Sequence, residues 1–165
     1  MKRLVLIAAI VFAAQSTAAQ GAVTEVAEFR AWRVFVHGAG ADKTCFIASA
    51  PQSSRGAEGR RRGPIALYVS NRPSAQVAGE VSVAIGYPFR KDAAEIEVGG
   101  AKYSLFTEGE TAWSDGADAT IVANMKAKRT LTGRATSQAG TRTVDSFSLL
   151  GFTNAHNRLN SECPA

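Results

Sequence analysis

Four arginines on one short segment are the densest group of chemically active side chains in this sequence. Arg55, Arg60, Arg61 and Arg62 lie within residues 51–64, which are rich in Gly, Pro and Ser and have no apolar period. This composition predicts an exposed, mobile loop. Clustered guanidinium groups can bind phosphate or carboxylate through paired hydrogen bonds. The sequence equally allows a solvated loop that only aids solubility.

Trp113 is the second candidate contact residue. It lies in the polar stretch 107–115, where an exposed indole would suit an interface hot spot. Because large aromatic side chains are mostly buried, the indole could instead fold back onto the core. The candidate partner-binding residues are therefore Trp113 and the four arginines.

The motifs of well-known catalytic sites are absent. The chain has no G-x-S-x-G, no H-E-x-x-H, no P-loop and no dinucleotide fingerprint. Its two histidines, His37 and His156, are 119 positions apart, and a lone histidine is usually a polar surface residue. Glu108 and Glu110 form a carboxylate pair that is typical of solvated charge. We assign no catalytic, metal-binding or cofactor-binding residue and expect a protein that is not an enzyme.

The chain begins with the pattern of a secretory signal peptide. Two basic residues precede the apolar run 4–14, and small residues follow it up to a cleavage site before Gln20. About 11 apolar residues are too few for a membrane span, which needs roughly 20. We predict a signal peptide at 1–19 and one domain at 20–165. Export by this signal peptide would give a periplasmic or secreted protein with no transmembrane segment after cleavage.

The charge balance bears on the class of partner. Loss of the two N-terminal basic residues reduces the 19 Lys and Arg to 17 against 14 Asp and Glu, so the net charge falls from +5 to +3. A mild positive excess favours anionic surfaces. The excess is only weak evidence for a nucleic-acid partner, and the expected export argues against one.

The two cysteines are expected to pair. Cys45 lies in a predicted strand and Cys163 is the third residue from the end of the sequence. Two cysteines in an oxidising compartment usually form a disulfide. The competing interpretations are two free thiols or one catalytic thiol, although no C-x-x-C motif is present.

Alternation of apolar and polar residues dominates the chain after residue 29 and predicts antiparallel strands. Asp115 is expected to cap a helix that runs to about Lys126. Phe152, Ala155 and Leu159 predict a short final helix over 151–159. The predicted fold is mainly β, an antiparallel β-sandwich or compact β-barrel with two short helices. The expected strands cover residues 32–36, 44–48, 65–70, 80–85, 95–98, 101–105, 130–136 and 141–149.

For one hairpin, the sequence predicts which residues pair across the two strands. Two adjacent glycines divide residues 95–105 into two alternating runs, which fits a two-residue turn with positive φ at both positions. That register pairs Ile96 with Tyr103 on the buried face. It pairs Glu97 with Lys102 on the exposed face, a favourable cross-strand contact.

Several short motifs occur together in a recognisable order. They are Phe-Arg-Ala-Trp-Arg-Val at 29–34, Lys-Thr-Cys at 43–45, Tyr-Pro at 87–88, Val-Gly-Gly at 98–100, Met-Lys at 125–126 and Phe-Ser-Leu-Leu-Gly-Phe-x-x-Ala at 147–155. In this order, over about residues 28–159, the chain resembles the invasion-associated locus B family of bacterial exported proteins. It departs from that family at 107–115, where many members have a further cysteine pair and this sequence has none. The resemblance implies an exported β-sandwich-like protein associated with host-cell invasion, and no catalytic residue follows from it.

The sequence therefore favours a non-enzymatic envelope or host-interaction protein. Its loops would bind an unidentified envelope or host protein, or an anionic surface, on a rigid β scaffold. One alternative is a periplasmic hydrolase for cell-wall or lipid material, with a site built from Asp115, Glu108 or His156. Another is a structural envelope protein without a specific ligand.

Overall fold

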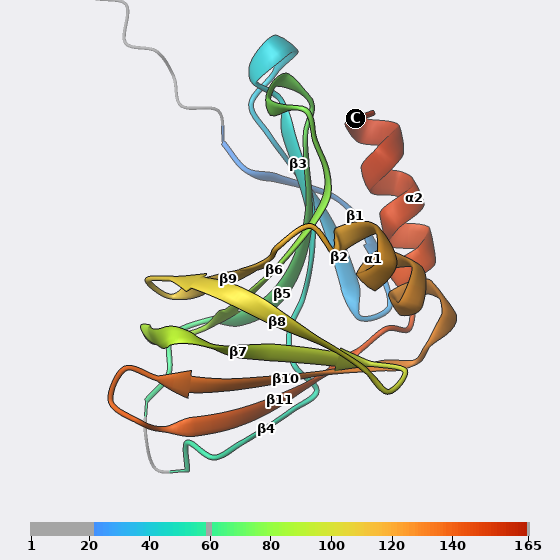
Figure 1. The fold of residues 1–165 in the computed structure, drawn as a ribbon. Coiled ribbons are helices and arrows are strands. Elements are labelled where there is room, and N and C mark those ends of the chain that lie inside the picture. The colour runs from blue at the N-terminus through green and yellow to red at the C-terminus, as the bar shows by residue number, and fades with distance from the viewer. Residues whose placement is uncertain (1–21, 59–60, 165) are drawn as a thin grey trace, which may run out of the picture.

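Eleven antiparallel strands and two α-helices account for most of the described chain (Figure 1). The computed structural model describes residues 22–58 and 61–164, so the predicted signal peptide and Arg60 lie outside the described residues. The strands are β1 (Thr24–Phe29), β2 (Trp32–His37), β3 (Thr44–Ser49), β4 (Ser53–Arg55), β5 (Ile65–Arg72), β6 (Val77–Ile85), β7 (Phe89–Val98), β8 (Ala101–Glu108), β9 (Thr111–Ser114), β10 (Thr130–Ser137) and β11 (Arg142–Ser148). The helices are α1 (Asp118–Ala127) and α2 (Phe152–Glu162).

All strands belong to one sheet in the order β1-β2-β3-β5-β6-β9-β8-β7-β10-β11-β4. In Figure 1, β3 and its neighbours rise toward the top of the view, whereas β7, β10 and β11 cross below them. The sheet therefore bends back on itself and encloses its apolar face. The predicted fold class, mainly antiparallel β with two short helices, is confirmed.

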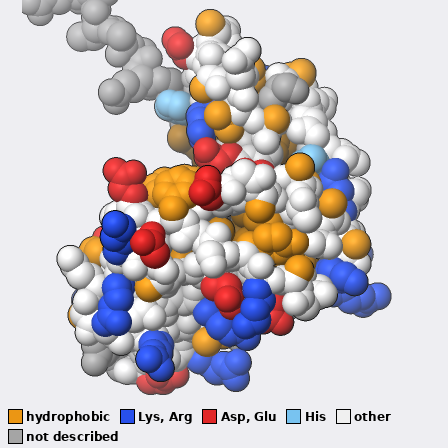
Figure 2. Space-filling view, in the orientation of Figure 1, with side chains coloured by type: hydrophobic (Ala, Val, Ile, Leu, Met, Phe, Trp, Pro, Cys, Tyr) orange, Lys and Arg blue, Asp and Glu red, His pale blue; other side chains and the backbone are white. Residues whose placement is uncertain are grey.

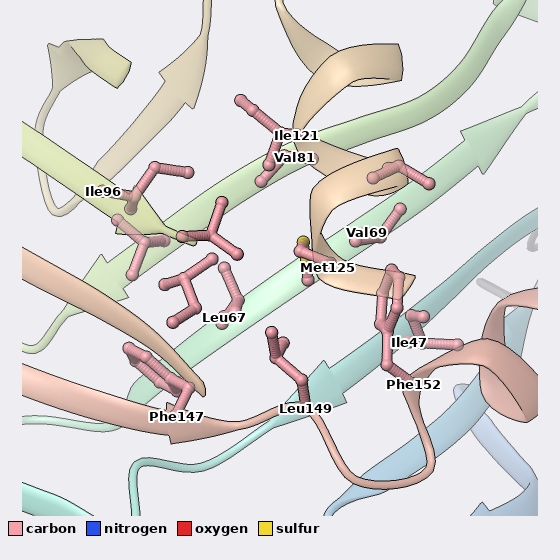
Figure 3. Close-up of a cluster of buried hydrophobic side chains, with 14 of the residues drawn as sticks. Ile47, Leu67, Val69, Val81, Ile96, Ile121, Met125, Phe147, Leu149 and Phe152 are labelled. Atoms are coloured by element: carbon pink, nitrogen blue, oxygen red, sulfur yellow. The ribbon is translucent and has the colours of Figure 1, made fainter. Parts of the chain in front are cut away.

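The core fills the inside of this bend (Figure 3). Alternate residues along the strands point inward, as the two-residue period of a strand requires. On α1, Ile121 and Met125 are fully buried and lie over Val69 and Val81 of the sheet. The helices thus close the inner face, to which the strands contribute most of the apolar side chains.

The hairpin of β7 and β8 has the predicted register. Ile96 pairs with Tyr103 and Glu97 with Lys102, and both turn glycines have positive φ, 63° at Gly99. The ion pairs differ from the expectation. Lys102 Nζ lies 3.4 Å from Glu95, while Glu97 binds Arg134 of β10 at 2.8 Å. A long basic side chain reaches diagonal as well as direct partners, so register alone does not fix the ion pair.

Three local predictions were wrong. Helix α1 begins at Asp118, and Asp115 does not cap it; Asp118 instead accepts a hydrogen bond from the backbone of Val81. The segment 51–64 is not loop throughout, because β4 forms within it and pairs with β11.

Strands β1 and β9 have no counterpart in the predicted list. Inward residues of β9 are Ala112 and Ser114, too small and polar to give an apolar alternation.

The disulfide joins the end of α2 to the sheet, as predicted. Cys45 of β3 bonds to Cys163 with the two Cα atoms 5.8 Å apart, and both side chains are buried. Asn71 of β5 donates to the Cys163 carbonyl at 2.9 Å. Lys43 donates to the carbonyl of Glu162 at 2.7 Å. The C-terminal helix is therefore held by one covalent bond and by polar contacts on either side of it.

Removal of this disulfide is expected to destabilise the protein strongly. The bond closes a separation of 118 residues, which corresponds to about 4–5 kcal/mol in the chain-entropy model. Guanidinium unfolding of the protein and of the Cys45→Ser, Cys163→Ser double variant measures the loss. Reductant should shift only the parent protein. Equal unfolding midpoints for parent and double variant would contradict this assignment.

Candidate functional site

The segment with the arginines ends in a buried ion pair. Arg62 donates from Nη1 to Asp145 Oδ1 at 2.8 Å and from Nη2 to Asp145 Oδ2 at 2.7 Å. The side chains of Arg62 and Asp145 are only 8% and 2% exposed. Asp145 points to the inner face of β11, on the same side as Phe147. A charged carboxylate at such a position requires a fixed partner, and the guanidinium fork supplies it with two parallel bonds.

Arg62 also joins the end of β6 to this pair. Its Nε donates to the carbonyl of Ile85 at 3.0 Å, and its guanidinium lies 5.1 Å from the centre of the Tyr87 ring. Tyr87 in turn shares a 2.6 Å hydrogen bond with Thr143 of β11. One side chain therefore connects the arginine segment, the end of β6 and β11.

Two glycines let the backbones meet closely beside this contact. The amide of Gly63 donates to the carbonyl of Gly86 at 2.8 Å. Gly86 has φ +73°, and a Cβ there would collide with the carbonyl of Gly63. Gly63, which follows the arginines, thus has a packing role in addition to the flexibility inferred from the sequence.

A hollow of about 460 Å³ opens next to Arg62. One wall comes from the arginine segment, one from the chain after β6, and one from the turn between β10 and β11. Arg61 lines the hollow with an exposed side chain, and Arg90 reaches Gly140 in the same turn. The lining residues are Ala57, Arg61, Arg62, Tyr87, Pro88, Ser137, Gln138, Ala139 and Thr141.

The structure brings three of the four predicted arginines together. A smaller hollow of about 140 Å³ is lined by Arg55 and shares Ala57 and Arg62 with the larger one. Arg55 and Arg61 are exposed, whereas Arg62 is largely committed to Asp145. The expectation of a wholly exposed cluster is wrong for Arg62. The acidic partner could not be found from the sequence, because it lies 83 positions away.

Trp113 lies apart from this hollow. It is half-buried on the outer face of β9, where its ring stacks on Phe106 of β8 with centroids 5.4 Å apart. The core lies on the opposite face of the sheet, so the alternative in which Trp113 folds back onto the core is wrong.

The three residues of the predicted hydrolase site are not assembled. His156 lines a separate hollow of about 500 Å³ with Asn160, and this hollow includes neither Asp115 nor Glu108. His156 Nδ1 lies 3.3 Å from Asn160 Nδ2, and Asn160 accepts from Asn71. Within residues 22–58 and 61–164, no group of three or more His, Cys, Asp or Glu side chains is placed to hold a metal ion.

The fold and site define a disulfide-linked, single-sheet antiparallel β protein with an arginine-bordered hollow. Comparison of the chain with protein-family models, with curated proteins and with solved structures found no match. The resemblance to the invasion-associated locus B family remains a prediction from the sequence. In the described part of the chain, neither helix is long and apolar enough to cross a membrane.

The buried pair predicts large effects of single substitutions. Arg62→Ala or Asp145→Ala should each lower the free energy of unfolding by about 3–5 kcal/mol, because each leaves the other charge buried and unpaired. The double variant Arg62→Ala, Asp145→Ala should lose much less than the sum of the two, because it leaves no unpaired buried charge. Urea unfolding of the four proteins measures the cycle.

The matched control is the exposed pair of Arg134 and Glu97. Arg134→Ala should cost less than about 1 kcal/mol, since both side chains are solvated. If Arg62→Ala also lowered the free energy of unfolding by less than about 1 kcal/mol, the buried pair would not be needed to hold the fold together.

His156 predicts a pH dependence of stability. Burial, with Lys126 nearby, lowers the pKa of His156 below its ordinary value of 6.5. The folded protein therefore resists protonation, and the stability contribution present above pH 6.5 is lost as the pH falls. The free energy of unfolding should decrease from about pH 7.5 to about pH 5.5 more steeply in the parent than in His156→Gln. Parallel profiles would contradict this.

Proposed function

We propose that this chain is an exported, non-enzymatic envelope or host-interaction protein that binds its partner at the hollow beside the arginine segment. The observation that carries the proposal is the position of Arg61, whose exposed side chain lines a hollow with one wall fixed by a buried ion pair. Export rests on the predicted signal peptide, and the envelope or host role on the family resemblance.

The chemistry of the hollow favours a ligand with an anionic group beside an apolar part. Pro88 and the ring of Tyr87 supply apolar surface, and Arg61 supplies a guanidinium that can bind carboxylate or phosphate. Because Asp145 already neutralises Arg62, the positive charge that the lining of the hollow offers to a ligand comes chiefly from Arg61. The proposed partner is an anionic group of an envelope or host molecule.

A hydrolase is the second candidate. It would have to use the hollow that contains His156, whose Nδ1 is engaged by Asn160. Among the described residues, no carboxylate lines that hollow, so the acid–base pair of the hydrolase prediction has no partner for His156 among them. The geometry thus supports binding better than hydrolysis.

Arg61 supplies the test of the binding site. A photo-crosslinking amino acid placed at Gln138, which is exposed and lines the hollow, should form an adduct in the native envelope or with host membranes. Arg61→Ala should reduce the adduct about tenfold or more, because a charge-assisted contact is worth about 1.5–3 kcal/mol. Mass spectrometry of the adduct identifies the partner.

Two controls keep the result specific. The same crosslinker at Asn157, exposed on α2, should give no such adduct, and Arg129→Ala removes an exposed arginine away from the hollow without reducing the yield. Equal losses for Arg61→Ala and Arg129→Ala would show general charge attraction. The absence of any adduct from Gln138 would contradict the proposed site.

A further inference from the structure

A row of aromatic side chains crosses the outer face of the sheet. The cross-strand register places Tyr68, Ser82, Trp113 and Phe106 opposite one another on successive strands, and Phe35 opposite Phe46 in the adjacent row. The aromatic row, as we name it, consists of Phe35 (β2), Phe46 (β3), Tyr68 (β5), Trp113 (β9) and Phe106 (β8).

The rings form two contacting groups, one on each side of Ser82. Phe35 and Phe46 stack with centroids 5.0 Å apart, and Phe46 meets Tyr68 edge-on at 6.1 Å. At the other end Phe106 stacks on Trp113. Ser82 lies between Tyr68 and Trp113 and is only 6% exposed although it is on the outer face. The larger neighbours therefore close over it.

Both helices cover the opposite face. Phe152 of α2 contacts Trp32 on the inner side of β2, and Ile121 and Met125 of α1 point to the core. Phe106 is 46% exposed, and the other four rings are half-buried. Figure 2 shows hydrophobic side chains gathered at the surface near β9, with acidic side chains on either side. The row is thus open to a ligand along the described outer face.

The dimensions of the row suit a linear polymer. It crosses six strands, and neighbouring strands lie about 4.8 Å apart, so it is about 24 Å long. Its width is only one to two residues. A stable protein interface buries about 800 Å² on each partner, which is much more than such a strip provides.

The position of the row within the sheet excludes binding by strand addition. Its inner strands already use their backbone hydrogen bonds on both sides, so an extended peptide cannot add as a further strand there. Of the charged side chains near the row, Arg33 is paired with Glu25 and Arg72 with Glu80. Glu108, two residues after Phe106 on the same face of β8, is exposed and borders the row at that end. The surface between them consists of aromatic rings, Ser and Ala. Flat, uncharged rings with polar edges fit it best.

We propose that the aromatic row binds a linear glycan, with the C–H faces of successive pyranose rings packed on the aromatic side chains. An aromatic ring carries partial negative charge on its face, which attracts the weakly positive C–H groups of a sugar. Hydroxyls of the glycan stay at the edge of the strip, near Ser70 and Thr111. This site is separate from the hollow beside Arg61 and does not depend on it.

Tryptophan fluorescence tests this proposal directly. The chain has two tryptophans, and Trp32 is fully buried, so a ligand that changes the emission without unfolding the protein reports on Trp113. The probes are the hexamer of N-acetylglucosamine and cellohexaose, which separate N-acetylated from plain β-linked chains, with glucose as the short control. A hexamer should change the emission saturably, whereas glucose at equal sugar concentration should not.

Substitutions then assign the surface. Phe106→Ala and Tyr68→Ala should each weaken hexamer binding at least tenfold, while Leu150→Ala, which removes an exposed side chain outside the row, should leave it unchanged. Circular dichroism checks that the variants fold; Phe106 is exposed enough to be replaced without loss of the core.

Two outcomes would overturn the proposal. The first is no binding of either hexamer by fluorescence and by calorimetry. The second is a dimer in solution that dissociates in Phe106→Ala, which would show that a second copy of this chain occupies the row.

Discussion

The fold is held closed by the placement of one guanidinium opposite one buried carboxylate. Asp145 lies on the inner face of β11, where an unpaired charge would be prohibitive. Arg62 provides its partner from a segment that lies between β4 and β5. The same side chain also binds the Ile85 carbonyl and lies over the ring of Tyr87. The end of β6 and strand β11 therefore meet at Arg62. The hollow beside Arg61 exists because these walls are fixed there.

The disulfide and the ion pair act at different places on the same bent sheet. Cys45 and Cys163 tie α2 to β3, which keeps Phe152 packed against Trp32. Arg62 ties the arginine segment to β11. With both tied, the inner face is filled and closed, and function is left to the outer surfaces. The two proposed sites use those surfaces differently, one through charge beside a hollow and the other through an aromatic row.

The sequence predicted what depends on neighbouring residues and missed what depends on distant ones. The hairpin of β7 and β8 followed from its turn glycines and alternation, and Leu159 followed from helical spacing. Strand β4 carries no apolar side chain and is defined only by pairing with β11. Likewise Arg62 is indistinguishable from Arg61 in sequence, although one is buried by Asp145 and the other is exposed. Trp113 drew attention by type, but its stacking on Phe106 required the register of β8 and β9.

Native-state hydrogen exchange in an Arg62→Lys variant tests the role of this guanidinium most directly. A lysine keeps the charge, but its ammonium group cannot form two parallel bonds to Asp145 and the bond to the Ile85 carbonyl at the same time. We expect the amide of Gly63, bonded to Gly86, and that of Gln52, bonded to Ser146, to lose protection in the variant. The amides of Val69 and Val83 in the core should keep theirs. Unchanged protection at Gly63 would contradict the claim that Arg62 holds the sheet closed.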